Sequence, residues 1–137
     1  MEERVVAQGH EHVGGTHTST FEVTTDDWLT PAGDCILAIE ANRAPADFAP
    51  AFVQACQAVD ATITATIAVD GYEAVVTGHG HPELTFDSHR SAVGRTSEYV
   101  DDRTIMVGAD AAAADLDRDL VTALATGAEL ELVLAVE

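Results

Sequence analysis

The strictest constraint on the fold is a two-residue alternation of apolar and polar side chains in segments 61–69 and 128–136. In the first segment Ile63, Ala65, Ile67 and Val69 alternate with threonines, and in the second segment leucines occupy every other position. Because successive side chains of a β-strand point to opposite faces, this pattern predicts two strands that each bury one face. A helix would spread the same apolar residues around its whole surface.

A tight turn connects the first of these segments to another strand. Asp70-Gly71 follows Val69 directly, and residues 72–77 resume an extended pattern. Asp-Gly between two strand patterns is typical of a two-residue β-hairpin. Further strands are predicted at 4–8, 17–24, 34–40, 84–86, 92–97 and 104–108.

Two segments change to a helical period of apolar residues. Asp47 is a suitable N-cap for the first helix, Asp115 and Asp117 suit the first turn of the second, and Gly127 can end it. The two apolar stripes are Phe48, Phe52, Ala55, Cys56 and Val59, and Leu116, Leu120, Val121 and Leu124.

These helical units read as two copies of one pattern. Segments 34–69 and 102–136 each run from strand through an acidic, alanine-rich loop to a helix and an alternating strand. Asp34 corresponds to Asp102, and the same offset relates Asp47 to Asp115. Upstream, Gly9-His10 has an echo in Gly80-His81. Chance similarity between alanine-rich units is the alternative, but the shared offset favours an internal duplication.

The predicted fold class is therefore mainly β, within the α+β proteins. We expect a β-sandwich, jelly-roll-like or a distorted barrel, of about eight strands with two added helices. A length of 137 residues fits one domain, 1–137, made of two pseudo-repeats at roughly 1–70 and 71–137. Such halves would pack about a pseudo-twofold axis, where paired residues converge.

The charge balance is strongly acidic. There are 24 acidic residues against six basic ones, all arginine, for a net charge of −18. A cationic partner is one interpretation. Adaptation to molar salt is the other, because a Debye length of about 3 Å screens acidic self-repulsion. The even spread of acids and the absence of lysine favour salt adaptation, as in a halophilic archaeon, and disfavour a nucleic-acid partner.

Other features point to the cytoplasm. Cys35 and Cys56 do not form a disulfide framework, and the start Met1-Glu2-Glu3-Arg4 is not a signal peptide. No apolar run approaches the ~20 residues of a membrane span. We therefore expect a cytoplasmic protein that does not enter the membrane.

Several motifs resemble an archaeal family of unknown function, DUF371. The similarity in the first half is carried by Gly9-His10, His17-Thr18-Ser19-Thr20-Phe21-Glu22 and Leu29-Thr30-Pro31-Ala32-Gly33-Asp34-Cys35-Ile36. In the second half it is carried by Gly80-His81-Pro82, Arg95-Thr96-Ser97, Asp102-Arg103-Thr104-Ile105 and Asp115-Leu116-Asp117-Arg118-Asp119-Leu120. The resemblance implies a β domain of jelly-roll or sandwich type with added helices, and it implies no activity.

The histidines are candidate metal ligands. His10 and His12 are two residues apart, as are His79 and His81, so on strands each pair would face one side. Imidazole pairs suit zinc or another divalent transition metal. His10, His17 and His81 are the predicted ligands of such a cofactor. The alternative is that these histidines satisfy backbone hydrogen bonds.

A second group could carry catalysis. Cys35 follows Gly33-Asp34 at a turn-to-strand junction, where His17 or Arg103 would be needed to lower its pKa. Asp34 and Asp102 would be an acid/base pair if the halves brought them together. The alternatives are a small buried cysteine and two aspartates that cap turns. Cys56 lies on a helix stripe and is expected in the core.

Arg95 and Arg103 stand out in a chain with so few cations. Each could pair with Asp102 or Asp34 to hold the sheet, or form a fork for phosphate or carboxylate together with His17. The leading hypothesis is thus a binding domain for a small anionic ligand or metal ion between two halves. A hydrolase using Asp34, Cys35 and His17, and an interaction module without a site, stay open. No phosphate-binding loop, dinucleotide fingerprint or serine nucleophile elbow is present.

Overall fold

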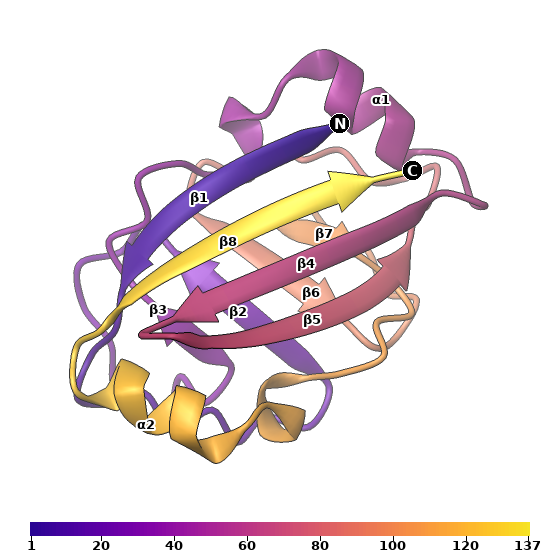
Figure 1. Cartoon of the computed structure of the whole chain (residues 1–137). Helices are drawn as coiled ribbons and strands as arrows, with labels where there is room; N and C mark the ends of the chain where they lie inside the picture. The colour runs from indigo at the N-terminus through magenta and orange to yellow at the C-terminus, as the bar shows by residue number, and fades with distance from the viewer.

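Two four-stranded sheets make up most of the molecule, a computed structural model that describes residues 1–137. Sheet I is antiparallel, with the order β1 (Glu2–Gln8), β8 (Glu129–Val136), β4 (Thr62–Val69) and β5 (Tyr72–His79). Sheet II has the order β3 (Ile36–Ala38), β2 (Thr20–Thr24), β6 (Ser91–Arg95) and β7 (Thr104–Met106). The two sheets form an open, mainly β sandwich with the chain termini side by side (Figure 1). The predicted fold class is confirmed.

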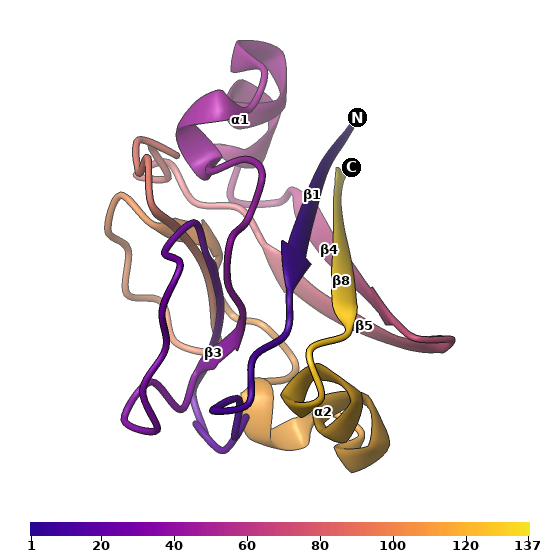
Figure 2. The ribbon, with the colours of Figure 1, turned by 90° about the vertical axis from the view of Figure 1, so that its left-hand side faces the viewer.

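The helices close the two ends of the sandwich. Helix α1 (Pro50–Cys56) lies at one end and α2 (Arg118–Ala125) at the other, each preceded by a short 3-10 turn (Figure 2). These turns are η1 (Pro45–Asp47) and η2 (Ala113–Asp115). Phe52 from α1 and Leu120 from α2 are fully buried in the core between the sheets. The alternating strands supply the rest of that core, because their apolar faces point inward.

The hairpin and the ends of the helices follow the sequence in part. Asp70 and Gly71 connect β4 to β5 with φ of 48° and 86°, as a two-residue hairpin requires, and Gly127 ends the last helical turn at φ 93°. The first helix, however, begins at Pro50 and not after Asp47. The Asp47 carboxylate instead accepts the Ala44 N–H and closes η1.

Other strand predictions were too long or wrong. β2, β3, β6 and β7 are shorter than predicted, because the chain leaves each sheet edge through loops. Residues 84–86 are not a strand: Leu84 and Phe86 are buried from a loop, and Phe86 has a φ of 52°. Their apolar side chains plug the end of the core, which explains why they imitate a short buried strand.

The two halves of the chain form equivalent backbone bridges. Gln8 forms an antiparallel bridge with Ile39, and His79 forms the equivalent bridge with Val107 in the second half. The sheet orders are unchanged when β1–β4 are exchanged for β5–β8. The spatial repeat follows from these bonds, whereas the division into repeats 1–70 and 71–137 within one domain stays a prediction.

The pseudo-twofold axis passes through both sheets. In sheet II, Glu22 pairs with Val93, and these two residues occupy equivalent positions of the two halves. In sheet I, Thr66 and Val133 are paired close to the same axis. Residues on the outer face of sheet II near Glu22 and Val93 therefore come from both halves and lie close together.

The loops after β1 and β5 cross into the opposite half. The Gly9 N–H donates to the Ala128 carbonyl, and the Gly80 N–H donates to the Ala61 carbonyl. A Cβ atom on Gly9 would overlap the Leu124 carbonyl at the end of α2, and one on Gly80 would overlap Cys56 at the end of α1. Each half thus locks the helix end of the other. None of the helices has the length and apolarity that crossing a bilayer requires.

Candidate functional site

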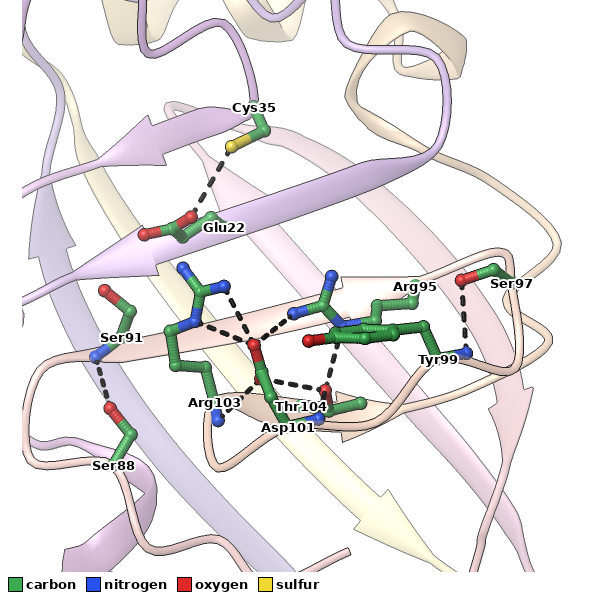
Figure 3. A network of polar contacts seen from close by, with 10 residues as sticks. All are labelled: Glu22, Cys35, Ser88, Ser91, Arg95, Ser97, Tyr99, Asp101, Arg103 and Thr104. Atoms are coloured by element: carbon green, nitrogen blue, oxygen red, sulfur yellow. Dashed lines mark hydrogen bonds and ion pairs between the residues drawn. The ribbon is translucent and has the colours of Figure 1, made fainter.

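The outer face of sheet II carries polar side chains from both halves, here called the sheet II network, although no hydrogen bond joins the two sides (Figure 3). Glu22 on β2 lies at the centre, with Cys35 beside it just before β3. Arg103, just before β7, is the equivalent of Cys35 in the second half, and its side chain extends toward Glu22 (Figure 3). No helix covers this face (Figure 2), and the network is only partly open to solvent, because Glu22, Arg95 and Thr104 are buried whereas Arg103 is partly exposed.

Two arginines of the second half share one carboxylate. Arg95 donates from Nη2 to Asp101 Oδ2 at 3.0 Å, and Arg103 donates from Nη2 and Nε to the same oxygen at 2.8 and 3.2 Å. Arg95 also donates from Nε to the Thr104 hydroxyl at 2.8 Å and stacks over the Tyr99 ring at 4.8 Å. The Asp101 carboxylate is thus the one acid that accepts hydrogen bonds from both guanidiniums.

A short turn holds that acid in place. The other oxygen of Asp101, Oδ1, accepts the Arg103 N–H at 2.9 Å and the Thr104 hydroxyl at 3.2 Å. The Thr104 hydroxyl in turn accepts the Asp101 N–H at 3.0 Å. Aspartate readily closes such turns by bonding the backbone two residues on. The segment Asp-Asp-Arg-Thr therefore fixes both the carboxylate and the start of β7.

Electrostatics keeps Asp101 ionised. Burial by itself raises the pKa of an aspartate, but hydrogen bonds from Arg103 and the attraction of Arg95 and Arg103 outweigh it and lower the pKa of Asp101 to about 2. Hydrogen bonding to Asp101 correspondingly raises the pKa of Arg103. The cluster therefore has fixed charges at every physiological pH.

Each guanidinium retains one unused nitrogen. Neither Arg95 Nη1 nor Arg103 Nη1 donates a hydrogen bond within the protein, and no buried side-chain nitrogen lacks a partner. These two Nη1 groups are consequently not fully buried. The Arg95 side chain is only 10 % exposed, whereas that of Arg103 is 43 % exposed. The pair therefore presents donors to solvent from a partly desolvated position.

The first-half side of the network consists of a carboxylate, Glu22, and a protonated thiol, Cys35. The Cys35 thiol donates to Glu22 Oε1 at 3.5 Å, and Glu22 is 9 % exposed. Burial, followed by the charge and hydrogen bond of Glu22, raises the pKa of Cys35 to about 11. Cys35 hydrogen-bonds neither His17 nor Asp34. Because its pKa is about 11, Cys35 is a protonated thiol at neutral pH. Cys56 is fully buried in the core, as expected.

The histidines cap turns. His10 Nδ1 accepts the His12 N–H at 3.0 Å, and His81 Nδ1 accepts the Glu83 N–H at 3.0 Å, so these residues lie in loops and not on strands. His17 Nδ1 accepts the N–H groups of Ser19 and Thr20. The chain contains no group of three or more His, Cys, Asp or Glu side chains that could hold a metal ion. The metal site stays a prediction, and no group of three or more potential ligands supports it.

His17 has an informative equivalent. Ser88, which occupies the same place in the second half, caps its own loop by accepting the N–H groups of Arg90 and Ser91 through its hydroxyl. A serine and a histidine thus perform the same structural task in the two halves. The Thr20 hydroxyl also contacts His17 Nδ1 at 3.1 Å, so His17 lies beside the start of β2. It forms no hydrogen bond with Arg95 or Arg103.

The two predicted aspartates lie at equivalent turns. The backbone carbonyl of Asp34 accepts the Thr16 and His17 N–H groups, and that of Asp102 accepts the Ser88 N–H. Arg95 and Arg103 form ion pairs, as one of the two alternatives predicted, but the predicted partners Asp102 and Asp34 were wrong, because both arginines bind Asp101. Sequence reasoning also missed Glu22 and Tyr99, and only their strand parity and loop position hinted at them.

The remaining four arginines are used differently. Arg4 pairs with Glu131, Arg43 with Glu3 and Arg90 with Asp26, one acid for each cation. Arg118 bonds only backbone carbonyls. Two guanidiniums on one carboxylate therefore occur at a single place in the molecule.

Comparison with known proteins gives consistent matches over nearly the whole chain. The family described as "Domain of unknown function (DUF371)" matches residues 5–137. An uncharacterised protein of Methanocaldococcus jannaschii is 36% identical over 130 residues, which cover 95% of this chain and 96% of that protein.

Proposed function

This chain belongs to the DUF371 family, and we propose that it binds a small anionic ligand through Arg95 and Arg103 on the outer face of sheet II. The observation that carries the proposal is the sharing of Asp101 by two guanidiniums, which leaves on each an Nη1 donor that is not fully buried. Paired guanidinium donors are the usual partners of phosphate and carboxylate groups.

Burial strengthens this site relative to an exposed arginine. Arg95 is held by Thr104, Asp101 and the Tyr99 ring, so little side-chain entropy remains to be lost when a ligand binds. The low exposure of Arg95 and Asp101 also reduces the screening of charge. Arg103 is more exposed and would make the first contact with the ligand.

Glu22 limits which anions fit. Its negative charge lies on the far side of Arg103, and the proximity of that charge contributes to the raised pKa of Arg103. Because the Arg103 guanidinium extends toward Glu22, an anion that it binds is repelled least on the side of Arg95 and Tyr99. A compact anion such as inorganic phosphate or acetate satisfies this geometry best.

The hydrolase alternative has less support. A cysteine nucleophile must ionise, and the pKa of Cys35 at about 11 leaves the thiol protonated at neutral pH. No hydrogen bond connects its sulfur to His17 or Asp34. Binding without covalent chemistry is the function that this geometry favours.

The test is an NMR titration with inorganic phosphate and with acetate at constant ionic strength. We expect shifts of the amides of Arg95, Asp101 and Arg103 in the native protein, and about tenfold weaker binding in Arg103→Gln, as for the loss of one charged hydrogen bond. The matched control is Arg90→Gln, which removes the same charge from the same sheet. Equal affinities of the two variants would overturn the proposal.

The composition supports a setting of molar salt in an archaeal cytoplasm. A net charge of −18 without any lysine causes strong self-repulsion in dilute buffer, which high salt screens. Circular dichroism across a KCl series tests this inference. We expect loss of the β-sheet signal at low salt, and a fully folded protein in dilute buffer would contradict it.

A further inference from the structure

A cavity of about 570 Å³ lies between the η1–α1 segment and loop 85–89. Its walls include Pro45, Phe48, Pro50, Val53, Phe86 and His89, and none of the sheet II network residues of Figure 3 lines it. Asp87 is the only acidic residue of the lining, and no lysine or arginine takes part. The cavity is therefore separate from the proposed anion site.

The second half shows what fills the equivalent position. There Arg118, at the start of α2, donates from Nη1 to the Gly15 carbonyl at 3.0 Å. Its Nη2 donates to the carbonyls of Ala113 and Leu116 at 2.8 and 2.9 Å. The molecule has one other cavity, beside the Asp70-Gly71 turn, and none at Arg118. A guanidinium thus closes the second-half position.

In the first half the equivalent of Arg118 is Pro50, because each is the first residue of its helix. Proline has no side-chain donor, so nothing in the chain replaces the guanidinium. The carbonyls equivalent to those of Leu116 and Gly15 belong to Phe48 and Phe86. Neither of these two carbonyls accepts a hydrogen bond within the protein.

The backbone at the two positions has the same shape. Phe48 has φ −74° and ψ 150°, and Leu116 has φ −74° and ψ 151°. Phe86 and Gly15 share the left-handed region, with φ of 52° and 58°. The Phe48 backbone therefore matches that of Leu116 in both angles, and Phe86 shares the φ region of Gly15.

We propose that this cavity, the α1 hollow, binds the guanidinium group of an arginine side chain carried by a partner polypeptide. The unbonded carbonyls of Phe48 and Phe86 would accept its N–H groups as Leu116 and Gly15 accept those of Arg118. The Phe48 ring already carries the Arg43 guanidinium at 5.3 Å and both phenylalanines are buried, so the two carbonyls are the recognition element of the hollow. The lining contains no lysine or arginine that would repel a guanidinium, and its one acid is Asp87.

The lining distinguishes this occupant from related cations. A lysine ammonium is a compact, strongly hydrated charge, whereas a guanidinium offers a planar fork that matches several carbonyls at once. Free arginine would bring an α-carboxylate to a hollow that contains no cation and one acid. An arginine within a polypeptide has no such carboxylate, and Pro45, Pro50 and Val53 offer apolar contact for its neighbours.

The experiment uses the full chain in buffered KCl and N-acetyl-arginine amide as the probe, with N-acetyl-lysine amide and free arginine for comparison. NMR should show saturable shifts at Phe48, Phe86 and His89. We expect about tenfold weaker binding of the lysine compound and of free arginine. Free arginine binding as tightly as the blocked compound would overturn the assignment to a polypeptide.

Two variants test the internal comparison. Pro50→Arg supplies the missing guanidinium from within, and we expect it to abolish probe binding at the α1 hollow. Arg118→Met opens the equivalent position, and we expect a second set of saturable shifts near Gly15 and Val121. Unchanged binding in Pro50→Arg, or no shift near Gly15 in folded Arg118→Met, would overturn the proposal.

Discussion

The two halves share one backbone and carry different chemistry on it. On the outer face of sheet II, the second half places Arg103 where the first half has Cys35. The hydrogen bonds that hold these positions are the same, since the Val93 N–H donates to the Arg103 carbonyl as the Glu22 N–H donates to the Cys35 carbonyl. Function is therefore to be sought where equivalent positions differ.

The starts of the two helices also differ between the halves. There the second half is closed by Arg118, and the first half is open at Pro50. The half that has a cation at its helix completes its own structure, whereas the half that lacks one retains a hollow. Each half thus has one feature that the other lacks, and each of the two proposed sites rests on such a difference.

The largest expected effect tests the common frame. Gly9→Ala and Gly80→Ala each force a Cβ into backbone carbonyls at the end of the opposite helix, so we expect each to cost about 4 kcal/mol or to prevent folding. Chemical denaturation in KCl measures it. Gly14→Ala, where nothing lies within 4 Å, is the neutral control. A large cost at only one of the two glycines would break the equivalence.

The next effect concerns the carboxylate that Arg95 and Arg103 share in the second half. Arg95→Met leaves Asp101 partly buried with one cation fewer, and we expect a loss of about 2 to 3 kcal/mol in the free energy of unfolding. Arg4→Met removes one partner of the exposed Arg4–Glu131 pair, and we expect a change below about 0.5 kcal/mol. Similar losses in both variants would show that the shared carboxylate has no special role.

Acid should remove the stabilising contribution of Asp101. The pKa of Asp101 is depressed to about 2 in the folded state, so its stabilising contribution is complete above the unfolded value near 4 and is lost as pH falls toward 2. We expect that contribution to be about 1 to 2 kcal/mol, measured by denaturation at stepwise pH. Asp101→Asn should be less sensitive to pH across this window. An unchanged pH dependence in that variant would contradict the assignment.

The smallest effect concerns the thiol that stands in the place of Arg103 in the first half. Because burial and Glu22 raise the pKa of Cys35 to about 11, we expect slow alkylation by iodoacetamide at neutral pH. Glu22→Gln removes the charge of Glu22 but not the burial, so the rate should rise only a few-fold. Cys56, with a pKa of about 12, serves as the internal control. Rapid alkylation of native Cys35 would revive the catalytic alternative.

The strands were predictable because alternation reports burial directly. Segments 62–69 and 129–136 bury every second residue. The 3-10 turns η1 and η2 were not predictable, since such short turns show no periodicity and their capping aspartates resemble helix N-caps. Phe86 was misassigned because a buried loop residue and a buried strand residue look alike in sequence.

The site was only half predictable. Arg95 and Arg103 were found because cations are rare in this chain, but Asp101 was missed. The repeat directed attention to Asp102, the equivalent of Asp34, while the acid that binds both arginines is the residue before it. The offset between equivalent residues also changes in the loops before β3 and β7, which concealed the match between His17 and Ser88. The spacing of residues in the sequence does not reveal which side chains pair across a sheet.

The central claim is that the two halves, on one shared backbone frame, bind opposite charges. One series of NMR spectra on the native protein, titrated first with inorganic phosphate and then with N-acetyl-arginine amide, tests it directly. We predict that phosphate shifts Arg95, Asp101 and Arg103 while the arginine compound shifts Phe48 and Phe86, each without affecting the other set. A single common set of shifts, or none with either probe, would contradict the account.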